Sequence, residues 1–235
     1  MRYAIYYTPA PTDTITRLAA GWLGRDAFGG GAIEPQPVGP LHAAEIAFHA
    51  APARRYGFHA TLKAPFALAQ GHNEAMLETA LAEFAAEAEP VAIPNLALHQ
   101  MDGFFALVPE KPVAALNLLA NEVVSEFDRF RAPLTEAEIE RRNPDQLSPA
   151  QFRYLCQWGY PYVFDAFRFH MTLTGRVGRE DSPRVRAALE ELFAGVVGHP
   201  LAVDALALFA ETEAGAPFVV RSRHEIGRRL DRKTA

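Results

Sequence analysis

The sequence predicts an α+β protein in which one unit of strands and helices is used twice. The segment Phe58–Leu62 (FHATL) recurs as Phe169–Leu173 (FHMTL), with four of five positions identical. Similar apolar strand-like and helix-like segments surround both copies in the same order. With 235 residues, 49% of them hydrophobic, the chain is long enough for a substantial core. We therefore expect a single two-lobed domain over residues 1–235, repeated internally at about 1–103 and 104–223.

The first unit has the order strand, helix, motif strand, helix and strand hairpin. Asn73 is a good N-cap for its second helix, and Asp102-Gly103 supplies the hairpin turn. The predicted elements besides the motif strand are Tyr3–Pro9, Thr14–Leu23, Asn73 to about Ala88, Pro90–Ile93 and Leu96–Leu98, leading into Phe104–Leu107.

The second unit repeats this order. Pro183 fits the first position of its second helix, with Ser182 before it as the N-cap. The predicted elements are Phe105–Pro109, Val113–Phe127, the motif strand, a helix from Ser182 to about Phe193, and the strands Pro200–Val203, Leu206–Leu208 and Pro217–Val220.

Two segments fall outside the repeat. Gly29–Pro40 is rich in Gly and Pro and predicts a connecting loop. Arg131–Tyr162 is an insertion in the second unit, and within it Pro149–Trp158 predicts a helix capped by Ser148. Because ordered insertions beside a site often shape specificity, we expect this segment to influence what the site accepts.

Composition limits the surroundings and partners of the protein. No apolar run approaches the roughly 20 residues of a membrane span, and a strand at the start argues against a secretory signal. The single cysteine, Cys156, excludes an internal disulfide, and we expect its thiol to be packed. These features favour a cytoplasmic protein. The net charge of −5 argues against an extended nucleic-acid surface, and the oligomeric state stays open.

The repeated motif supplies the candidate catalytic residues. Because alternate side chains of a strand share a face, His59 lies beside Thr61, and His170 beside Thr172. Two imidazoles across one cleft can act as general base and general acid, and the threonine hydroxyls can donate to phosphoryl oxygens. The competing interpretation is a duplicated structural strand whose polar face is merely solvated. The sequence does not decide which histidine is the acid.

Three further residues are candidates for substrate binding. Lys63 lies two residues after Thr61, and Arg168 two before His170, so strand parity places both on the motif face. Either side chain can bind phosphate, and ordinary solvation at a strand edge is the alternative. Tyr160 can stack on a base or a sugar, although core packing explains it equally well.

Other chemistries lack their motifs. The chain contains no His-Glu-x-x-His and no paired cysteines, so we expect no metal and no cofactor. It also lacks a Gly-x-Ser-x-Gly elbow and a Gly-rich phosphate loop ending in Gly-Lys-Ser/Thr. A mechanism that uses side chains alone fits the sequence best.

The doubled His-x-Thr strand resembles the two-histidine (2H) phosphoesterase superfamily over nearly the whole chain. The contexts Arg54–Phe66 (RRYGFHATLKAPF) and Trp158–Tyr162 (WGYPY) resemble its bacterial branch that is often encoded beside phosphonate-utilisation genes. The resemblance implies pseudo-twofold lobes with antiparallel sheets flanking a cleft and helices outside. It also implies metal-independent hydrolysis of a small cyclic phosphodiester, with His59, Thr61, His170 and Thr172 as the catalytic pairs.

Two alternatives stay open beside this hypothesis. One is an RNA-end 2′,3′-cyclic phosphodiesterase or ligase, which predicts a basic groove beside the histidines. The other is a module that binds nucleotides without turnover. The acidic net charge and the long insertion both argue against RNA, and the expected partner is a small phosphate ester.

Overall fold

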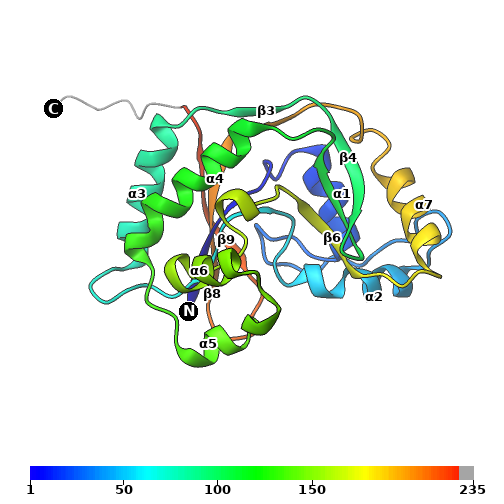
Figure 1. Ribbon diagram of the computed structural model, residues 1–235. Helices are drawn as coiled ribbons and strands as arrows, with labels where there is room; N and C mark the ends of the chain where they lie inside the picture. The colour runs from blue at the N-terminus through cyan, green and yellow to red at the C-terminus, as the bar shows by residue number, and fades with distance from the viewer. Residues whose placement is uncertain (228–235) are drawn as a thin grey trace.

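The computed structural model describes residues 1–227 and shows a mixed α+β architecture, as predicted (Figure 1). Antiparallel strands form the centre, and helices pack on the outside. The strands are β1 (Arg2–Tyr7), β2 (Ala60–Phe66), β3 (Val91–Ile93), β4 (Leu96–Met101), β5 (Phe104–Pro109), β6 (Met171–Arg176), β7 (Leu201–Val203), β8 (Ala205–Glu211) and β9 (Val219–Glu225).

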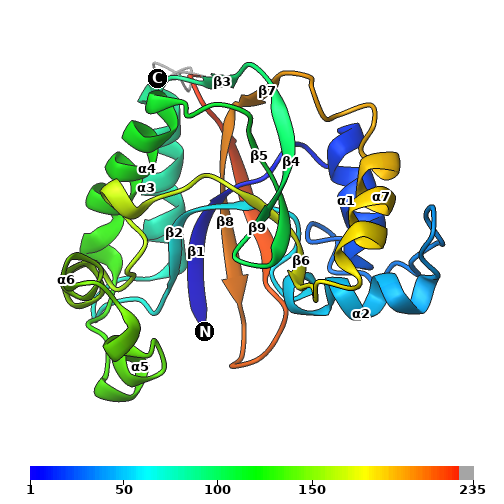
Figure 2. The same ribbon diagram turned by 45° about the vertical axis from the view of Figure 1, so that its right-hand side comes forward.

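The helices flank the strands in two groups. In both ribbon views α3 and α4 lie on one side of the strands, and α1, α2 and α7 lie on the other (Figure 2). The α-helices are α1 (Thr14–Leu23), α2 (Ala43–Arg54), α3 (Glu74–Glu87), α4 (Ala114–Glu126), α5 (Glu136–Glu140), α6 (Pro149–Trp158) and α7 (Ser182–Leu192). Short 3₁₀ helices are η1 (Phe127–Phe130), η2 (Pro144–Gln146) and η3 (Phe164–Ala166).

The main sheet has the strand order β4-β5-β6-β2-β1-β8-β9, and β3 pairs separately with β7. Every pairing is antiparallel. At the middle of the main sheet, β2 and β6 share a single pair of Cα partners, Ala60 and Met171. The sheet thus consists of two well-paired parts that join at one point. That point lies beside both motif histidines.

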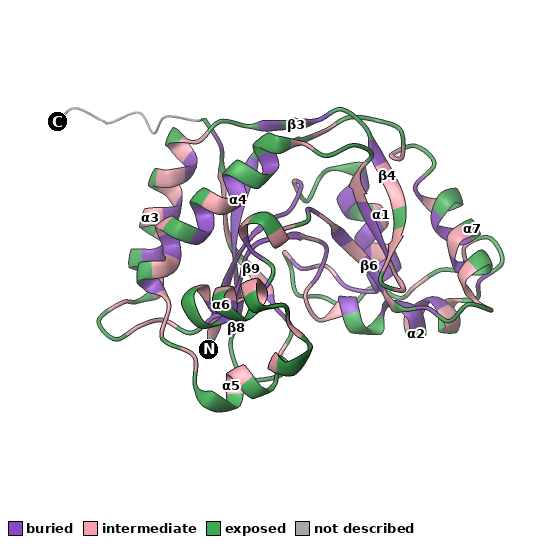
Figure 3. Cartoon of the chain, viewed as in Figure 1, coloured by how far each residue is buried: buried purple, intermediate pink, exposed green. Residues whose placement is uncertain are grey.

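The core lies between the sheet and the helices. Buried positions follow the strands and the inward faces of the helices (Figure 3). One large cluster joins apolar side chains from both units, including Leu62, Leu107, Leu173 and Leu208. A smaller cluster lies on the other face of β1 and β8 and includes Tyr6, Phe209 and Phe218. The candidate site described below lies against this second cluster.

The predicted local elements are largely confirmed. Helix α1 has the predicted bounds, and the side chain of Asn73 caps α3 by accepting a hydrogen bond from the Met76 N–H. Ser148 caps α6 through a reciprocal box with Gln151. Helix α7 differs at its start, because Asp181 rather than Ser182 occupies the N-cap.

Two features differ from expectation. Helix α2 has no counterpart in the sequence analysis, because Pro52 interrupts its pattern and its buried face carries a histidine, His49, among small residues. Cys156 is exposed and not packed, because α6 buries only Leu155 against the rest of the protein. No helix within residues 1–227 is both long enough and apolar enough to cross a membrane.

Candidate active site at the junction of the two motif strands

The two motif segments meet where the two parts of the sheet join. Ala60 and Met171 are fully buried and pair across the junction. Since successive side chains of a strand alternate, the residues on either side of this pair point to the opposite face. Those residues are His59, Thr61, His170 and Thr172.

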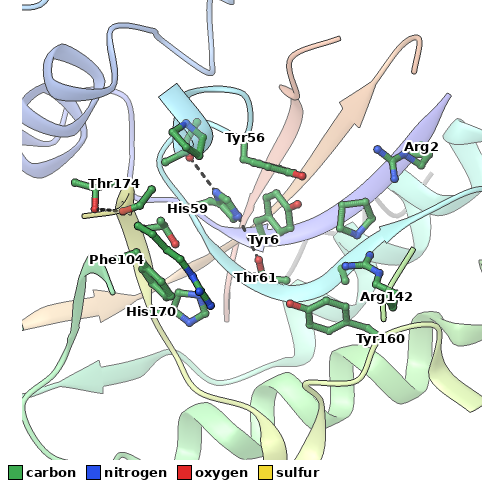
Figure 4. Close-up of a pocket in the computed structure, with 18 residues that line it drawn as sticks. Arg2, Tyr6, Tyr56, His59, Thr61, Phe104, Arg142, Tyr160, His170 and Thr174 are labelled. Atoms are coloured by element: carbon green, nitrogen blue, oxygen red, sulfur yellow. Dashed lines mark hydrogen bonds between the residues drawn. The ribbon is translucent and has the colours of Figure 1, made fainter. Parts of the chain in front are cut away.

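All four of these side chains line one cavity of about 410 Å³. Figure 4 shows both imidazoles directed into it, with Thr61 beside His59. The cavity is within the size range of small-molecule sites. Its lining residues are Arg2, Tyr6, Pro52, Ala53, Tyr56, Gly57, His59, Thr61, Ala64, Pro65, Phe104, Arg142, Tyr160, His170, Thr172, Thr174, Gly175 and Arg176.

Each imidazole is held by a backbone carbonyl two residues before it. Nδ1 of His59 lies 2.9 Å from the Gly57 carbonyl oxygen, and Nδ1 of His170 lies 2.7 Å from that of Arg168. A carbonyl only accepts, so in both rings Nδ1 carries the hydrogen and donates it. Each neutral ring therefore keeps the lone pair on Nε2, the nitrogen that a proton transfer in the cavity requires.

Aromatic side chains pack around both rings. The His59 ring stacks on Tyr6 with centroids 3.9 Å apart and planes 23° apart. Phe209 and Tyr56 also lie near this ring, each with a centroid distance of 6.1 Å. Phe104 lies 5.7 Å from the His170 ring. These contacts remove water from the imidazoles.

This loss of water lowers the pKa of both histidines. Burial lowers the pKa of His59 to about 4, against the hydrogen bond to Gly57, and repulsion from His170 adds to the effect. Burial also lowers the pKa of His170, and the hydrogen bond to Arg168 acts in the opposite direction. In the free protein both rings are therefore neutral at pH 7. When one proton enters the pair, it goes preferentially to His170.

The Thr61 hydroxyl is poised beside His59. Its Oγ1 lies 3.2 Å from His59 Nε2. Because that nitrogen carries a lone pair in the tautomer fixed by Gly57, the hydroxyl is the donor. An anion that enters the cavity can accept the hydrogen bond of Thr61 in place of Nε2. His59 Nε2 would then be free to accept a proton.

Arginines make the cavity positive. Arg2, Arg142 and Arg176 line it, and no Asp or Glu does. Arg2 pairs with Glu211 at 2.5 Å, whereas among residues 1–227 neither Arg142 nor Arg176 forms an ion pair. The Cζ atom of Arg142 instead lies over the Tyr160 ring, 5.3 Å from the ring centroid. The cavity is therefore suited to an anion.

Lys63 does not reach this cavity, contrary to the parity argument. Thr61 pairs with Tyr6 of β1, and Lys63 pairs with the adjacent residue of that strand, Ile5. Two steps along β2 therefore match one step along β1, so β2 carries a bulge there. The extra residue turns Lys63 to the core face, where it is 3% exposed. Its Nζ donates to the Val124 carbonyl at 3.0 Å and to Asp128 at 3.2 Å. Lys63 thus has a structural partner in place of a phosphate.

The other two predicted binding residues lie at or near the cavity. Tyr160 lines it directly. Arg168 is exposed and lines an adjoining cavity of about 520 Å³, which shares Thr61, Tyr160 and His170 with the first. The adjoining cavity also contains Asp102 and Asp165, so its lining is mixed in charge.

Sequence reasoning missed the residues that complete the cavity. Parity would have indicated Thr174 and Arg176, which continue the alternation from His170 and Thr172 along β6. Arg2 shares a strand face with Tyr6 in the same way. Arg142 lies in the insertion outside any regular element, and no periodicity marks it. Within residues 1–227, no three His, Cys, Asp or Glu side chains are grouped so that they could hold a metal ion.

Comparison with known proteins places the chain in a family. A family model described as "Protein of unknown function (DUF1045)" matches residues 61–219, which is more than half of the chain. The chain belongs to this family. The matched region holds Thr61, His170 and Thr172, and it begins two residues after His59.

Two curated relatives are named ribose 1,5-bisphosphate phosphokinase PhnN. The one from Janthinobacterium sp. (strain Marseille) is 38% identical over 227 residues, covering 93% of this chain and 49% of the relative. The one from Laribacter hongkongensis (strain HLHK9) is 37% identical over 218 residues, covering 93% and 50%. The chain thus spans about half the length of the curated relatives it matches.

Solved structures resemble the chain only distantly. The protein TT0787 of Thermus thermophilus matches with a TM-score of 0.46 and 13% identity, covering 97% of this chain and 98% of that one. E. coli LigT complexed with 3′-AMP matches with a TM-score of 0.41 and 14% identity, covering 96% and 97%.

Proposed function

We propose that this protein is a metal-independent phosphoesterase of the two-histidine type, which hydrolyses a small cyclic phosphodiester of a sugar or nucleotide. The observation that carries the proposal is the matched pair of imidazoles in one positive cavity. Each donates Nδ1–H to a backbone carbonyl and keeps Nε2 for the substrate. The names of the two relatives, which concern a phosphorylated ribose, support a small sugar phosphate.

The pKa order supports an assignment of roles. His59, whose pKa is lowered further, is the general base and takes a proton from the attacking water. The water oxygen bonds to phosphorus while the bond from phosphorus to one ring oxygen breaks. His170, as imidazolium, donates its proton to the leaving alkoxide. The products are a phosphomonoester and a free hydroxyl, and exchange with solvent restores both rings.

The threonines and arginines stabilise charge in this scheme. Thr61 turns its hydroxyl from His59 Nε2 to a non-bridging phosphoryl oxygen, and Thr172 acts from the other strand. Donors placed in advance around the phosphoryl group act most strongly where negative charge develops. Arg176, at the end of β6, adds positive charge on the same strand face as His170.

Single substitutions of the histidines test this function. We expect the purified protein to open at least one of ribose 1,2-cyclic, ribose 5-phosphate 1,2-cyclic and nucleoside 2′,3′-cyclic phosphates. His59→Ala and His170→Ala should each lower kcat by about 10²–10⁴ while the thermal transition is retained. His199→Ala is the matched control, because His199 is exposed and does not line the cavity.

Two results would contradict the proposal. Failure to open any cyclic phosphate, combined with tight nucleotide binding that the same substitutions weaken, would favour a binding module. Preferential processing of RNA ends, with activity that falls steeply as salt rises, would favour the RNA-end alternative. The mixed charge of the adjoining cavity, with Asp102 and Asp165 beside Arg168, argues against a long RNA path.

A further inference from the structure

Arg25 is a buried cation that no carboxylate balances. It follows Gly24, the C-cap of α1, and it is only 5% exposed. Within residues 1–227 its guanidinium forms no ion pair, and its Nε has no hydrogen-bond partner. Burying a charge without a counter-charge is costly, so an arginine at this position indicates a role that an apolar side chain would not fill.

The guanidinium binds three backbone carbonyls from two distant segments. Nη1 donates to the carbonyls of Arg54 and Arg55, at 3.2 Å each. Nη2 donates to the carbonyl of Phe218, just before β9. The first two carbonyls lie at the C-terminal end of α2, where backbone acceptors lack partners within the helix and carry partial negative charge. Arg25 therefore satisfies the end of α2 and joins it to β9.

The turn that Arg25 holds leads directly to His59. It covers residues 54–57 and ends at Gly57, which has φ +74°. A Cβ at Gly57 would lie 2.5 Å from the methyl group of Ala27, so the turn packs closely against the segment that follows Arg25. The Gly57 carbonyl accepts the Nδ1–H of His59 at 2.9 Å. The place of this acceptor, and with it the tautomer of His59, depends on the turn.

The same end of α1 also reaches the second motif strand. The indole Nε1–H of Trp22 donates to the Leu173 carbonyl of β6 at 2.9 Å, and this contact is buried. Because β6 and β2 share a single pair of Cα partners, the sheet itself joins the two motif strands at one point. Helix α1 contacts both α2 and β6, and the three lie together in Figure 2.

We propose that the C-terminal end of α1 positions both imidazoles, with Arg25 acting on His59 through the turn and Trp22 acting on His170 through β6. Neither side chain lines the cavity, so both are positioning residues. The expected effect on turnover rests on the proposed function, whereas the effect on the rings can be measured in the free protein. Two proton transfers at one phosphorus require both Nε2 atoms in fixed places, which the single-point junction alone does not ensure.

Nuclear magnetic resonance of the free protein tests the role of Arg25. Long-range proton–nitrogen correlation spectra at pH 7 distinguish an imidazole with its hydrogen on Nδ1 from one with its hydrogen on Nε2, and His59→Ala identifies the signal. We expect the Nδ1–H form of His59 in the unsubstituted protein. Arg25→Ala should give a mixture of both forms, because the Gly57 carbonyl is no longer held, and kcat should fall by about 10²-fold. The signals of His170 should not change.

Added guanidinium ion should reverse the effects of Arg25→Ala, since it can occupy the vacated space and donate to the same carbonyls. Sodium ion at equal ionic strength should not. Arg25→Lys serves if Arg25→Ala does not fold. Its ammonium keeps the charge but lacks the planar fork that spans the turn and Phe218, so Arg25→Lys should also give the mixed tautomer.

Arg54→Ala is the matched control. Its guanidinium also joins α1 to α2 through a backbone carbonyl, since Nε donates to the Leu23 carbonyl at 2.8 Å, but it does not bind the carbonyls of the turn. Arg54→Ala should lower stability and leave the tautomer of His59 unchanged. Trp22→Phe removes the indole N–H and keeps an aromatic ring, so it should alter the signals of His170 and not those of His59.

The two histidines must respond separately for the proposal to hold. A single Nδ1–H form of His59 in folded Arg25→Ala or Arg25→Lys would overturn it, as would an equal change in Arg54→Ala or unchanged His170 signals in Trp22→Phe. Separate responses in a protein that opens no cyclic phosphate would support the positioning roles and reject the phosphoesterase function. Ring opening without these responses would have the opposite meaning.

Discussion

At the scale of single residues, the tautomer of each histidine follows from the chain itself. Gly57 and Arg168 each present a carbonyl to the Nδ1 two residues later, and this contact leaves Nε2 free in both rings. Burial by its aromatic neighbours affects the pKa of His59 more than the hydrogen bond to Gly57 does. They disfavour the imidazolium form, so the pKa of this ring lies below that of an exposed histidine.

The maximum of kcat/KM should therefore lie at acidic pH, between the pKa of His59 and that of His170. In the proposed mechanism the base, His59, must be neutral, so activity should fall on the acid side only when the pH drops toward the pKa of His59, which is about 4. In the proposed mechanism the acid is His170, so only the fraction of the free protein that carries a proton on His170 can react. Because burial lowers its pKa below the ordinary 6.5, kcat/KM should already decline as the pH rises through values below 6.5.

Steady-state kinetics between pH 3.5 and 9 check this prediction. The profile of kcat should decline at a higher pH than that of kcat/KM, since a bound phosphate anion favours the imidazolium form of His170. An acid limb near pH 6.5, or a kcat/KM that stays constant up to pH 8, would contradict the assigned roles.

The motif residues were predictable at this scale, and Arg142 was not. Alternation along a strand places Thr61 with His59 and Thr172 with His170, and the four side chains do line one cavity. The same alternation failed for Lys63, because a bulge depends on how β1 and β2 pair and leaves no mark in the sequence of either strand. Arg142 reaches the cavity only through the folding of the insertion.

At the scale of elements, the bulge links the site strand to the insertion. Lys63 turns inward and contacts Val124 and Asp128. Asp128 also accepts from Arg131, which donates onward to Gln157 near the end of α6. A chain of polar contacts thus joins β2 to the segment that carries Tyr160. The lysine that was expected to bind phosphate supports the wall of the cavity instead.

Lys63→Met should destabilise the protein by about 1–3 kcal/mol at pH 7, because it leaves the Val124 carbonyl buried without its donor. The loss should grow as the pH rises. Burial lowers the pKa of Lys63 to about 8, so between pH 8 and the ordinary 10.5 the unfolded chain binds more protons at this residue. The lysine therefore adds stability to the unsubstituted protein as the pH increases through this window.

Urea unfolding at pH 7, 8, 9 and 10 measures this difference. The comparison is Lys111→Met, which removes an exposed lysine and should change stability little at any pH. A difference between Lys63→Met and the unsubstituted protein that stays constant from pH 7 to 10 would contradict the role given to the buried ammonium.

At the scale of the whole molecule, the strand order interleaves the two units. Strands β2 and β1 belong to the first unit, yet β6 pairs with β2 and β8 pairs with β1. Likewise β4 of the first unit pairs with β5 of the second. The order of segments along the chain predicted which elements form. It did not predict this exchange, since the partner of each strand is set by packing between distant segments.

The internal duplication stays a prediction, and the strand order agrees with it. Moving outward from the junction, the sheet has β2, β1 and β8 on one side, with β9 as an additional edge strand, and β6, β5 and β4 on the other. In each triplet the motif strand is innermost, the first strand of the same unit is next, and a strand from the other unit follows. A cavity at such a junction takes one histidine from each unit.

Separation of the units should abolish folding, because neither half contains a complete sheet. A fragment of residues 1–103 lacks β8 as the partner of β1 and exposes the face of β2 toward β6. A fragment of residues 104–227 keeps the pairs β5–β6 and β8–β9 but lacks β2 beside β6 and β1 beside β8. Unpaired backbone groups and half of a shared core leave too little buried apolar area to offset the entropy of ordering the chain.

We expect each fragment alone to lack a cooperative thermal transition in circular dichroism. The full chain should show one transition, and its near-ultraviolet and far-ultraviolet signals should coincide. Mixing the two fragments should restore native signal in proportion to their concentration, because β1 and β8 can still pair between separate chains. A single fragment that unfolds cooperatively on its own would mean that the units are independent domains, each bringing its histidine to an interface rather than to a shared sheet.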